Sequence, residues 1–227
     1  MRYALIVIAV LMLAGCAMAD DIVTMPTANQ LKAGEVDVAA YYLKLDLPEG
    51  APQHVNYETI YVGITKQLEL DAHIASVDKD RTSTVLVGSF KVLSETKELP
   101  DLVVGCRNLL GEATTNGPGH DQSQDRSYFV SAAKTFFMNP SQPGPPLVRA
   151  HLSLGTADWT LLGEKRHQGL FGGLQFLFRP EIGAVIEDDG QDLITGITIM
   201  PKNSGLTIKG GGYGPHWWAG VAFRKQF

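Results

Sequence analysis

Cysteine is scarce in this chain, and long apolar runs are missing after its first segment. The sequence holds two cysteines, and one of them, Cys16, lies in a predicted export signal. Cys106 therefore has no partner for an intramolecular disulfide, and no metal site of several thiolates can form. No later apolar run reaches the roughly 18 residues that a transmembrane helix needs, so any membrane span must be built from strands.

Positive charge is not in excess either. The formal net charge is −5 and the isoelectric point is near 5.6, which argues against a nucleic-acid partner. The 24 glycines and 12 prolines, with a mean hydropathy near zero, fit an all-β chain with many turns. Composition alone does not separate a membrane barrel from a soluble sandwich.

Residues 1–19 read as a signal peptide, with Arg2 before the apolar stretch Ala4–Leu13. Two processing routes are open. Leu13–Cys16 matches a bacterial lipobox, which makes Cys16 a candidate lipidation site. Ala17–Ala19 before Asp20 matches ordinary signal-peptidase cleavage. We favour the lipobox because all four of its positions fit, and both routes carry the chain out of the cytoplasm.

The mature chain reads as a periplasmic N-terminal segment, residues 20–34, followed by strands. Period-2 alternation and turn residues predict twelve strands, most of them near the 9–11 residues, roughly, that a tilted strand needs to cross a bilayer. They are 35–46, 56–65, 67–77, 83–94, 101–110, 126–138, 147–156, 169–178, 181–188, 192–200, 204–212 and 216–227. We expect one antiparallel transmembrane β-barrel of about twelve strands over residues 35–227.

The connections differ between the two sides of this barrel. With the N-terminus in the periplasm, one side receives Leu47–Val55, Asp78–Thr82, Gly111–Asp125 and Ala157–Gln168. Most of the connections on the other side are short turns. Long loops outside and short turns inside are typical of outer-membrane barrels. An even strand number also returns Phe227 to the periplasmic side.

Alternation predicts an apolar outer face and a polar lumen. The last strand places Trp217, Ala219, Val221 and Phe223 on one face. A soluble barrel would show the same alternation with the two faces exchanged. The strands near 36–45 and 83–94 change face midway, which predicts a bulge or a wrong boundary. The charged residues predicted to face the lumen carry both signs and could pair there: Glu69, Asp71, Arg107, Arg149, Glu187, Lys209 and Arg224.

The C-terminus ends on an aromatic residue, with Phe223 and Phe227 in the last strand. This ending resembles the C-terminal signal of bacterial outer-membrane barrels. The resemblance implies an outer-membrane address, contact with outer-membrane lipid, and recognition of the last strand by the barrel-assembly machinery.

Four short motifs follow one another along the chain: Ile22–Ala28, Tyr61–Thr65, Pro100–Gly105 with Asn108–Gly111, and Pro180–Gly190. Together they resemble the YjbH-like outer-membrane proteins, a barrel family linked to exopolysaccharide production whose members are often lipoproteins. The resemblance implies a polysaccharide partner and supplies no catalytic residues. This chain is short for that family.

Metal and cofactor signals are weak. The six histidines show no metal-ligand spacing. The acidic stretch Asp188–Asp192 reads as a hairpin turn that needs no cation, and Gly210–Gly212 reads as a strand end rather than a phosphate loop. We expect no cofactor and no metal.

One catalytic motif competes with a purely structural role. His151 and Ser153 resemble the His-x-Ser pair of lipid A deacylases, and Glu164 follows at a distance that could orient a histidine. Alternation, however, places the pair on the lumen side with Arg149. The sequence therefore favours a non-enzymatic envelope barrel, with a small pore and a lipid A hydrolase as alternatives.

Overall fold

The structure is a computed structural model that describes residues 26–227 except 50, 52, 79–80, 111–125, 140–143 and 162–163. Within this part no helix is long and apolar enough to cross a membrane. The chain forms twelve strands: β1 (Glu35–Lys44), β2 (His54–Gly63), β3 (Leu68–Val77), β4 (Arg81–Leu93), β5 (Asp101–Arg107), β6 (Ser127–Phe137), β7 (Leu147–Leu161), β8 (Glu164–Arg179), β9 (Ile182–Asp188), β10 (Leu193–Ile199), β11 (Leu206–Tyr213) and β12 (His216–Gln226).

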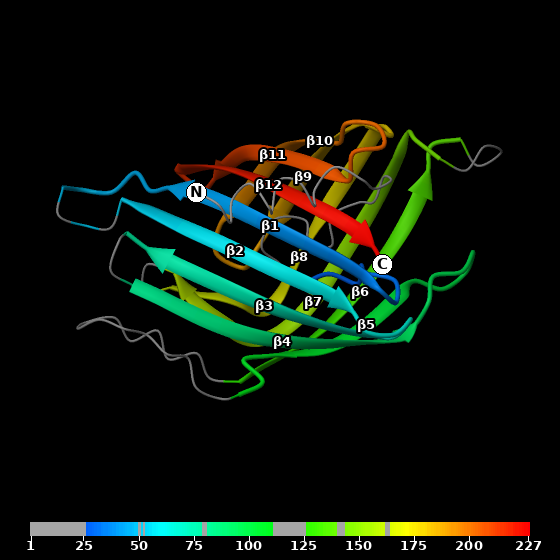
Figure 1. The fold of residues 1–227 in the computed structure, drawn as a ribbon, viewed down its shortest axis with the longest axis horizontal. Coiled ribbons are helices and arrows are strands. Elements are labelled where there is room, and N and C mark those ends of the chain that lie inside the picture. The colour runs from blue at the N-terminus through cyan, green and yellow to red at the C-terminus, as the bar shows by residue number, and fades with distance from the viewer. Residues whose placement is uncertain are drawn as a thin grey trace.

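The strands close into a single antiparallel barrel, which confirms the predicted fold (Figure 1). Each strand pairs with its neighbours in sequence, and β12 pairs with β1 from Glu35↔Gln226 to Lys44↔Trp217. Each strand therefore has a neighbour on both sides, and the sheet has no edge strand among the described residues. We call the end where β1 begins and β12 finishes the turn end, and the opposite end the loop end.

The seam between the first and last strands is fastened at the turn end. The backbone N–H of Phe227 donates to the Gly34 carbonyl over 2.9 Å, and the Gly34 N–H donates to Gly63 O over 2.8 Å. Gly34 has φ +78°, a left-handed conformation that glycine adopts without strain. The chain therefore turns sharply into β1 at the point where the barrel closes.

The largest difference from the predicted strands concerns β7 and β8. The predicted loop at Ala157–Gln168 is wrong, because both strands continue through it and pair from Leu147↔Leu177 to Leu161↔Glu164. Their pairing shifts register between Thr156 and Trp159. A register shift breaks period-2 alternation, which explains why the pattern lost the strands there. The other predicted long loop, Gly111–Asp125, lies outside the described residues.

The two predicted changes of face have different outcomes. In β4 the pairing with β5 shifts register between Lys91 and Leu93, so the predicted bulge is confirmed. In β1 the pairing with β2 and β12 continues without a shift, so there is no bulge. The other alternative, a wrong boundary, applies instead, because the strand ends at Lys44 and not at the predicted position 46. Its inward side chains instead change along the strand from acidic, at Glu35 and Asp37, to apolar, at Tyr41 and Leu43.

Candidate functional site

The barrel interior holds the charged residues that the sequence assigned to the lumen. Six of the seven are buried: Glu69, Asp71, Arg107, Glu187, Lys209 and Arg224. Arg149 is half-buried on the same inner side of β7. One ion pair spans the seam, since Arg224 Nε donates to Asp37 Oδ2 over 2.9 Å. Opposite charges that meet across strands offset the cost of removing each from water.

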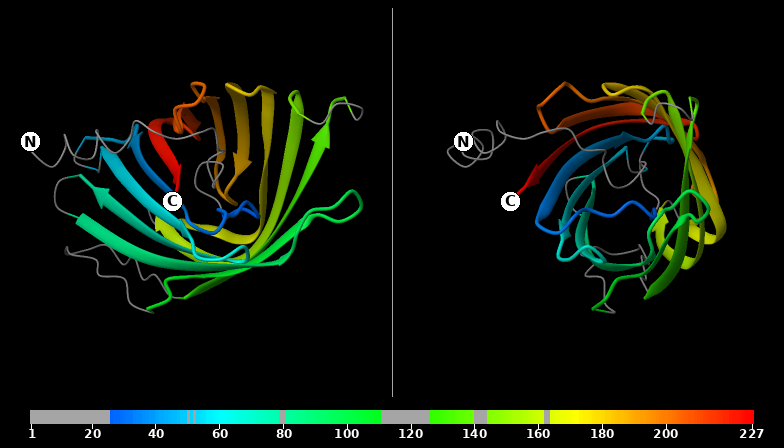
Figure 2. Two further views of the ribbon diagram at one scale, coloured as in Figure 1. Left: turned by 45° about the vertical axis from the view of Figure 1, so that its right-hand side comes forward. Right: turned by 90° about the vertical axis from the view of Figure 1, so that its right-hand side faces the viewer.

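A stretch of chain before β1 lies inside the barrel, which the sequence did not indicate. Residues 26–31, which we call the lumen segment, run within the ring of strands, where the blue trace crosses the opening (Figure 2, right). Ala28 is fully buried and Leu31 is 2% exposed. Ala28 packs in an apolar cluster with inward side chains of β4, β5 and β6: Val85, Val87, Val103, Phe129 and Ala133.

Hydrogen bonds hold the lumen segment to the wall formed by β3, β4, β6 and β7. The Leu31 N–H donates to Glu69 Oε2 over 2.7 Å, and Gln30 Nε2 donates to Ser89 Oγ over 2.7 Å. At the far end of the segment, Ser131 Oγ donates to the Pro26 carbonyl over 3.1 Å. Ser131 is the fifth of the eleven residues of β6, so the segment reaches about halfway along the barrel wall.

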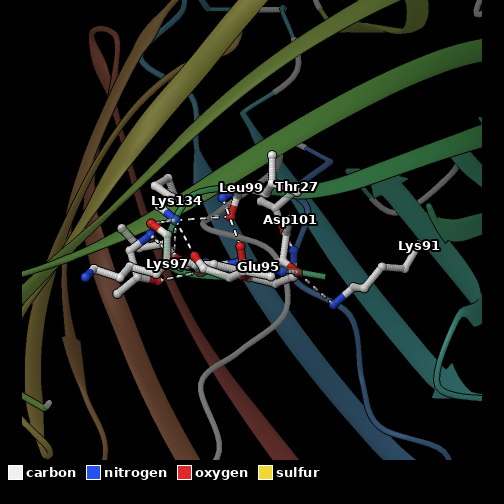
Figure 3. A network of polar contacts seen from close by, with 11 residues as sticks. Thr27, Lys91, Glu95, Lys97, Leu99, Asp101 and Lys134 are labelled. Carbon is white, nitrogen blue, oxygen red and sulfur yellow. Dashed lines mark hydrogen bonds and ion pairs between the residues drawn. The ribbon is translucent and has the colours of Figure 1, made fainter. Parts of the chain in front are cut away.

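An ion-pair network lies beneath the lumen segment at the turn end (Figure 3). Arg149 contacts Glu95 at 2.6 Å and Asp101 at 2.5 Å through its two terminal nitrogens. Its Nε donates to Asn29 Oδ1 over 2.7 Å, which ties the lumen segment to the network. Lys91 lies 3.6 Å from Asp101. Because Arg149 binds two carboxylates and an amide, it is a shared anchor of the wall and the segment.

The turn between β4 and β5 is fixed by the same network. Lys134 Nζ donates to the carbonyl oxygens of Thr96, Lys97 and Leu99 at 2.5 to 3.0 Å. The carboxylate of Glu95 accepts from the backbone N–H and the hydroxyl of Thr135. This turn is thereby held against β6 at the edge of the lumen.

Apolar side chains occupy the opposite part of the interior, toward the loop end. The loop-end cluster is made of Leu45, Val55, Phe171, Val185, Ile194, Tyr213 and Trp218. Trp218 lies over Gly196, where an added Cβ would come within 2.6 Å of the indole. Its Nε1 donates to the carbonyls of Thr195 and Gly212. Gly196 of β10 therefore makes room for a large inward side chain.

The lumen segment also needs a glycine beside it. A Cβ on Gly63 of β2 would fall 2.1 Å from the Lys32 carbonyl oxygen and 3.0 Å from that of Leu31. Real Cβ atoms do not approach backbone oxygens so closely, so a side chain at this position would displace the segment or the strand. The absence of a side chain at Gly63 thus leaves room for the backbone of Leu31 and Lys32, between the lumen segment and the start of β1.

The acidic turn between β9 and β10 already has partners for its central carboxylate. Asp189 accepts from Tyr213 Oη at 2.5 Å and from the turn N–H groups of Gln191 and Asp192. Arg166 Nη1 lies 3.3 Å from Asp189 and 2.6 Å from Asp192. No group of three or more metal-ligating side chains occurs among the described residues.

The His151–Ser153 pair faces the lumen, as the alternation predicted. Both residues are buried. Ser153 Oγ lies 2.8 Å from Ser131 Oγ and 3.2 Å from the Pro26 carbonyl. Neither ring nitrogen of His151 has a hydrogen-bond partner among the described residues. The serine hydroxyl is therefore engaged with the lumen segment rather than with a base, and the side chain of Glu164 lies outside the described part.

The outer wall is apolar along most of its height. Outward residues of strands around the barrel are large and exposed, among them Ile60, Leu70, Val130, Leu152, Leu174, Ile186, Ile197, Ile208 and Val221. Aromatic side chains lie toward both ends of this band. Tyr42 packs on Trp217 at the loop end, with ring centroids 5.5 Å apart, and Phe176 stacks on Phe178 near the turn end. Such aromatic girdles border the apolar band of membrane barrels.

The remaining predicted positions lie at the termini or on the outer wall. Cys16 and the cleavage site after Ala19 lie outside the described residues. Phe227 is exposed at the turn end, whereas Phe223 is 8% exposed between its strand partners Val38 and Leu206. Cys106 is a free, half-buried thiol.

Comparisons with known proteins place the fold in a known class. No family model and no curated protein matches the sequence. Among solved structures, the KdgM porin aligns with a TM-score of 0.50 at 9% identity, over 85% of this chain and 99% of that one. The N-terminal barrel domain of Pseudomonas aeruginosa OprF aligns over 86% of this chain at 12% identity, with a TM-score of 0.28.

The fold is a closed antiparallel β-barrel of twelve strands that resembles an outer-membrane porin. The chain shares its architecture with the KdgM porin, with an apolar outer wall and a charged interior. At this level of identity the likeness concerns the fold alone.

Proposed function

We propose that this chain is a non-enzymatic β-barrel protein of the bacterial outer membrane. The observation that carries the proposal is the sorting of side chains, with exposed apolar residues on the outer wall and buried ionic pairs inside. A soluble barrel sorts its side chains the other way, because its apolar face must leave water. A lipid bilayer is the environment in which this outer wall is favourable.

We further propose that the lumen of the barrel is blocked, and that the protein serves the cell envelope with a link to exopolysaccharide production. Support for a closed lumen comes from the lumen segment on one side and the loop-end cluster on the other. The exopolysaccharide link, and a polysaccharide partner, rest on the resemblance of four sequence motifs to the YjbH-like proteins.

A strain carrying the gene and a strain lacking it test both parts. The protein is expected in the outer-membrane fraction, migrating faster on a gel when unheated than when boiled, since a closed barrel resists detergent unfolding. Secreted polysaccharide is expected to fall in the strain that lacks the gene. Recovery of the protein in the soluble fraction would refute the membrane assignment, and unchanged polysaccharide would refute the envelope role alone.

A small pore is the second candidate. It is favoured by the way the lumen segment is held, through side-chain hydrogen bonds and not through strand pairing. In planar bilayers the wild-type protein is expected to show no steady current under the closed-barrel proposal. A steady wild-type current would favour the pore.

A further inference from the structure

We propose that the lumen segment is a displaceable plug, and that its displacement turns the closed barrel into a pore that prefers cations. This inference rests on the proposed membrane location. It adds an activity that the closed barrel does not have, and it assigns that activity to residues 26–31 and the wall that holds them.

The first argument is that the ring of paired strands is complete without the lumen segment. Residues 26–33 lie outside the twelve strands, and the ladder of strand pairs runs around the ring without them. Five side chains of the wall make the hydrogen bonds to the segment described above: Glu69, Ser89, Ser131, Ser153 and Arg149. Small polar hydroxyls and charged groups are easily rehydrated, so water can replace the segment at this wall.

The second argument is that the loop-end cluster and the lumen segment lie against different strands of the barrel. The loop-end cluster comes from β8 to β12 and from the ends of β1 and β2 that face the loops. The lumen segment packs on β3 to β7. Removal of the segment therefore leaves the loop-end cluster in place and opens a passage along β3 to β7. That passage is lined on one part by the apolar side chains that pack on Ala28 and on the rest by polar groups, among them Glu69, Ser89, Ser131 and Ser153.

The third argument concerns charge in that passage. Arg149 keeps its two carboxylate partners, Glu95 and Asp101, when the segment leaves. Glu69 loses the Leu31 N–H from its Oε2, keeps Ser89 near its Oε1, and adds a carboxylate to the wall of the passage. Asp71 of β3 and Arg107 of β5 face the same lumen with opposite charges that offset one another. An acidic side chain in a narrow, low-dielectric passage attracts cations and repels anions.

Gly63→Ala is the variant that tests the plug without touching its hydrogen bonds. The added Cβ would overlap the Lys32 carbonyl at 2.1 Å, so the segment is expected to leave its seat and a steady current to appear in planar bilayers. Gly212→Ala is the matched control and should stay closed, because its Cβ would meet Thr195 Oγ1 at 3.4 Å and the His216 carbonyl oxygen at 3.9 Å, both ordinary contacts. Heat-modifiable migration establishes that each variant is a folded barrel.

A second variant removes the donors at the far end of the segment. Ser131→Ala combined with Ser153→Ala leaves the Pro26 carbonyl without its two hydroxyls, and it is expected to conduct as well. Adding Glu69→Gln to either conducting variant should lower the permeability ratio of K⁺ over Cl⁻ toward unity. A ratio that does not move would refute the role of Glu69 in selectivity.

Thiol labelling reports on the plug independently of current. Ser89, under Gln30, is changed to Cys in a Cys106→Ser background and treated with a water-soluble thiol reagent in vesicles. Labelling is expected to be slow in the otherwise wild-type barrel and many-fold faster with Gly63→Ala. Folded, membrane-inserted variants that neither conduct nor label faster would overturn the plug, while failure to insert would overturn the proposed membrane location instead.

Discussion

At the scale of single residues, Ser153 illustrates how a motif loses its catalytic meaning in context. A serine becomes nucleophilic near neutral pH when a base accepts its proton. Here the hydroxyl contacts Ser131 and the Pro26 carbonyl, while His151 lies in the wall with both ring nitrogens unpartnered among the described residues. The outward neighbours, Leu152 and Leu154, are the exposed ones.

Ser153→Ala is therefore expected to leave lipid A acylation unchanged, because no acyl substrate in the membrane reaches a hydroxyl inside the barrel. Mass spectrometry of lipid A from cells expressing each form measures this, with His151→Ala as the companion variant. Loss of a deacylated species in either variant would contradict both the orientation and the non-enzymatic function.

Residue by residue, the sequence predicted strand faces well and missed what fills the lumen. Glu69 and Lys209 could be placed because an inward residue repeats every second position. The lumen segment could not be predicted, because Pro26 contacts Ser131 and Ser153, which lie 105 and 127 positions further along the chain. The alternation of residues along one strand does not indicate contacts between such distant positions. The signal that was available is Gly63, a glycine inside a strand, which often marks a close approach of other backbone.

At the scale of the element, each strand is defined by two faces with opposite demands. In β7, His151 and Ser153 are buried while Leu152 and Leu154 are exposed. The same strand runs to Leu161, well past its predicted end, because pairing with β8 continues through a register shift. Pairing, unlike side-chain alternation, tolerates such an irregularity.

Leu152→Arg tests which medium the outer face of β7 meets. A cation near the middle of a bilayer costs roughly 2–4 kcal/mol of barrel stability, so the urea midpoint for unfolding from lipid vesicles should fall. Gln168→Arg is the matched control near the loop end, where the residue is already polar and exposed, and its effect should be small. Equal midpoints for the two variants would contradict a membrane-embedded outer wall.

At the scale of the whole molecule, the C-terminal residue has separate roles in the finished barrel and in its making. The Phe227 N–H closes the seam on Gly34, while its side chain is 74% exposed. The exposed ring contributes little to packing, which is consistent with its predicted role as a recognition signal for the barrel-assembly machinery.

Phe227→Ala keeps the backbone hydrogen bond and removes the ring. We expect less folded barrel in the outer membrane of cells, measured by heat-modifiable migration, and unchanged refolding of purified protein in detergent. Phe227→Tyr, which retains an aromatic ring, should assemble normally. If the purified alanine variant also fails to refold, the ring has a structural role and the recognition signal is refuted.

The β1–β12 seam also determines when the barrel can finish folding, because its two strands come from opposite ends of the chain. Asp37 and Arg224, which pair across it, are 187 positions apart in the chain. Contacts between such distant residues require a large loss of chain entropy before they return any stability, which slows folding. In the proposed export of the chain from its N-terminus, the first strand emerges long before its partner, and its unpaired edge is prone to aggregate in the meantime. For the proposed outer-membrane location, we therefore expect shielding of the nascent chain, rather than fast folding, to protect the protein before the barrel closes.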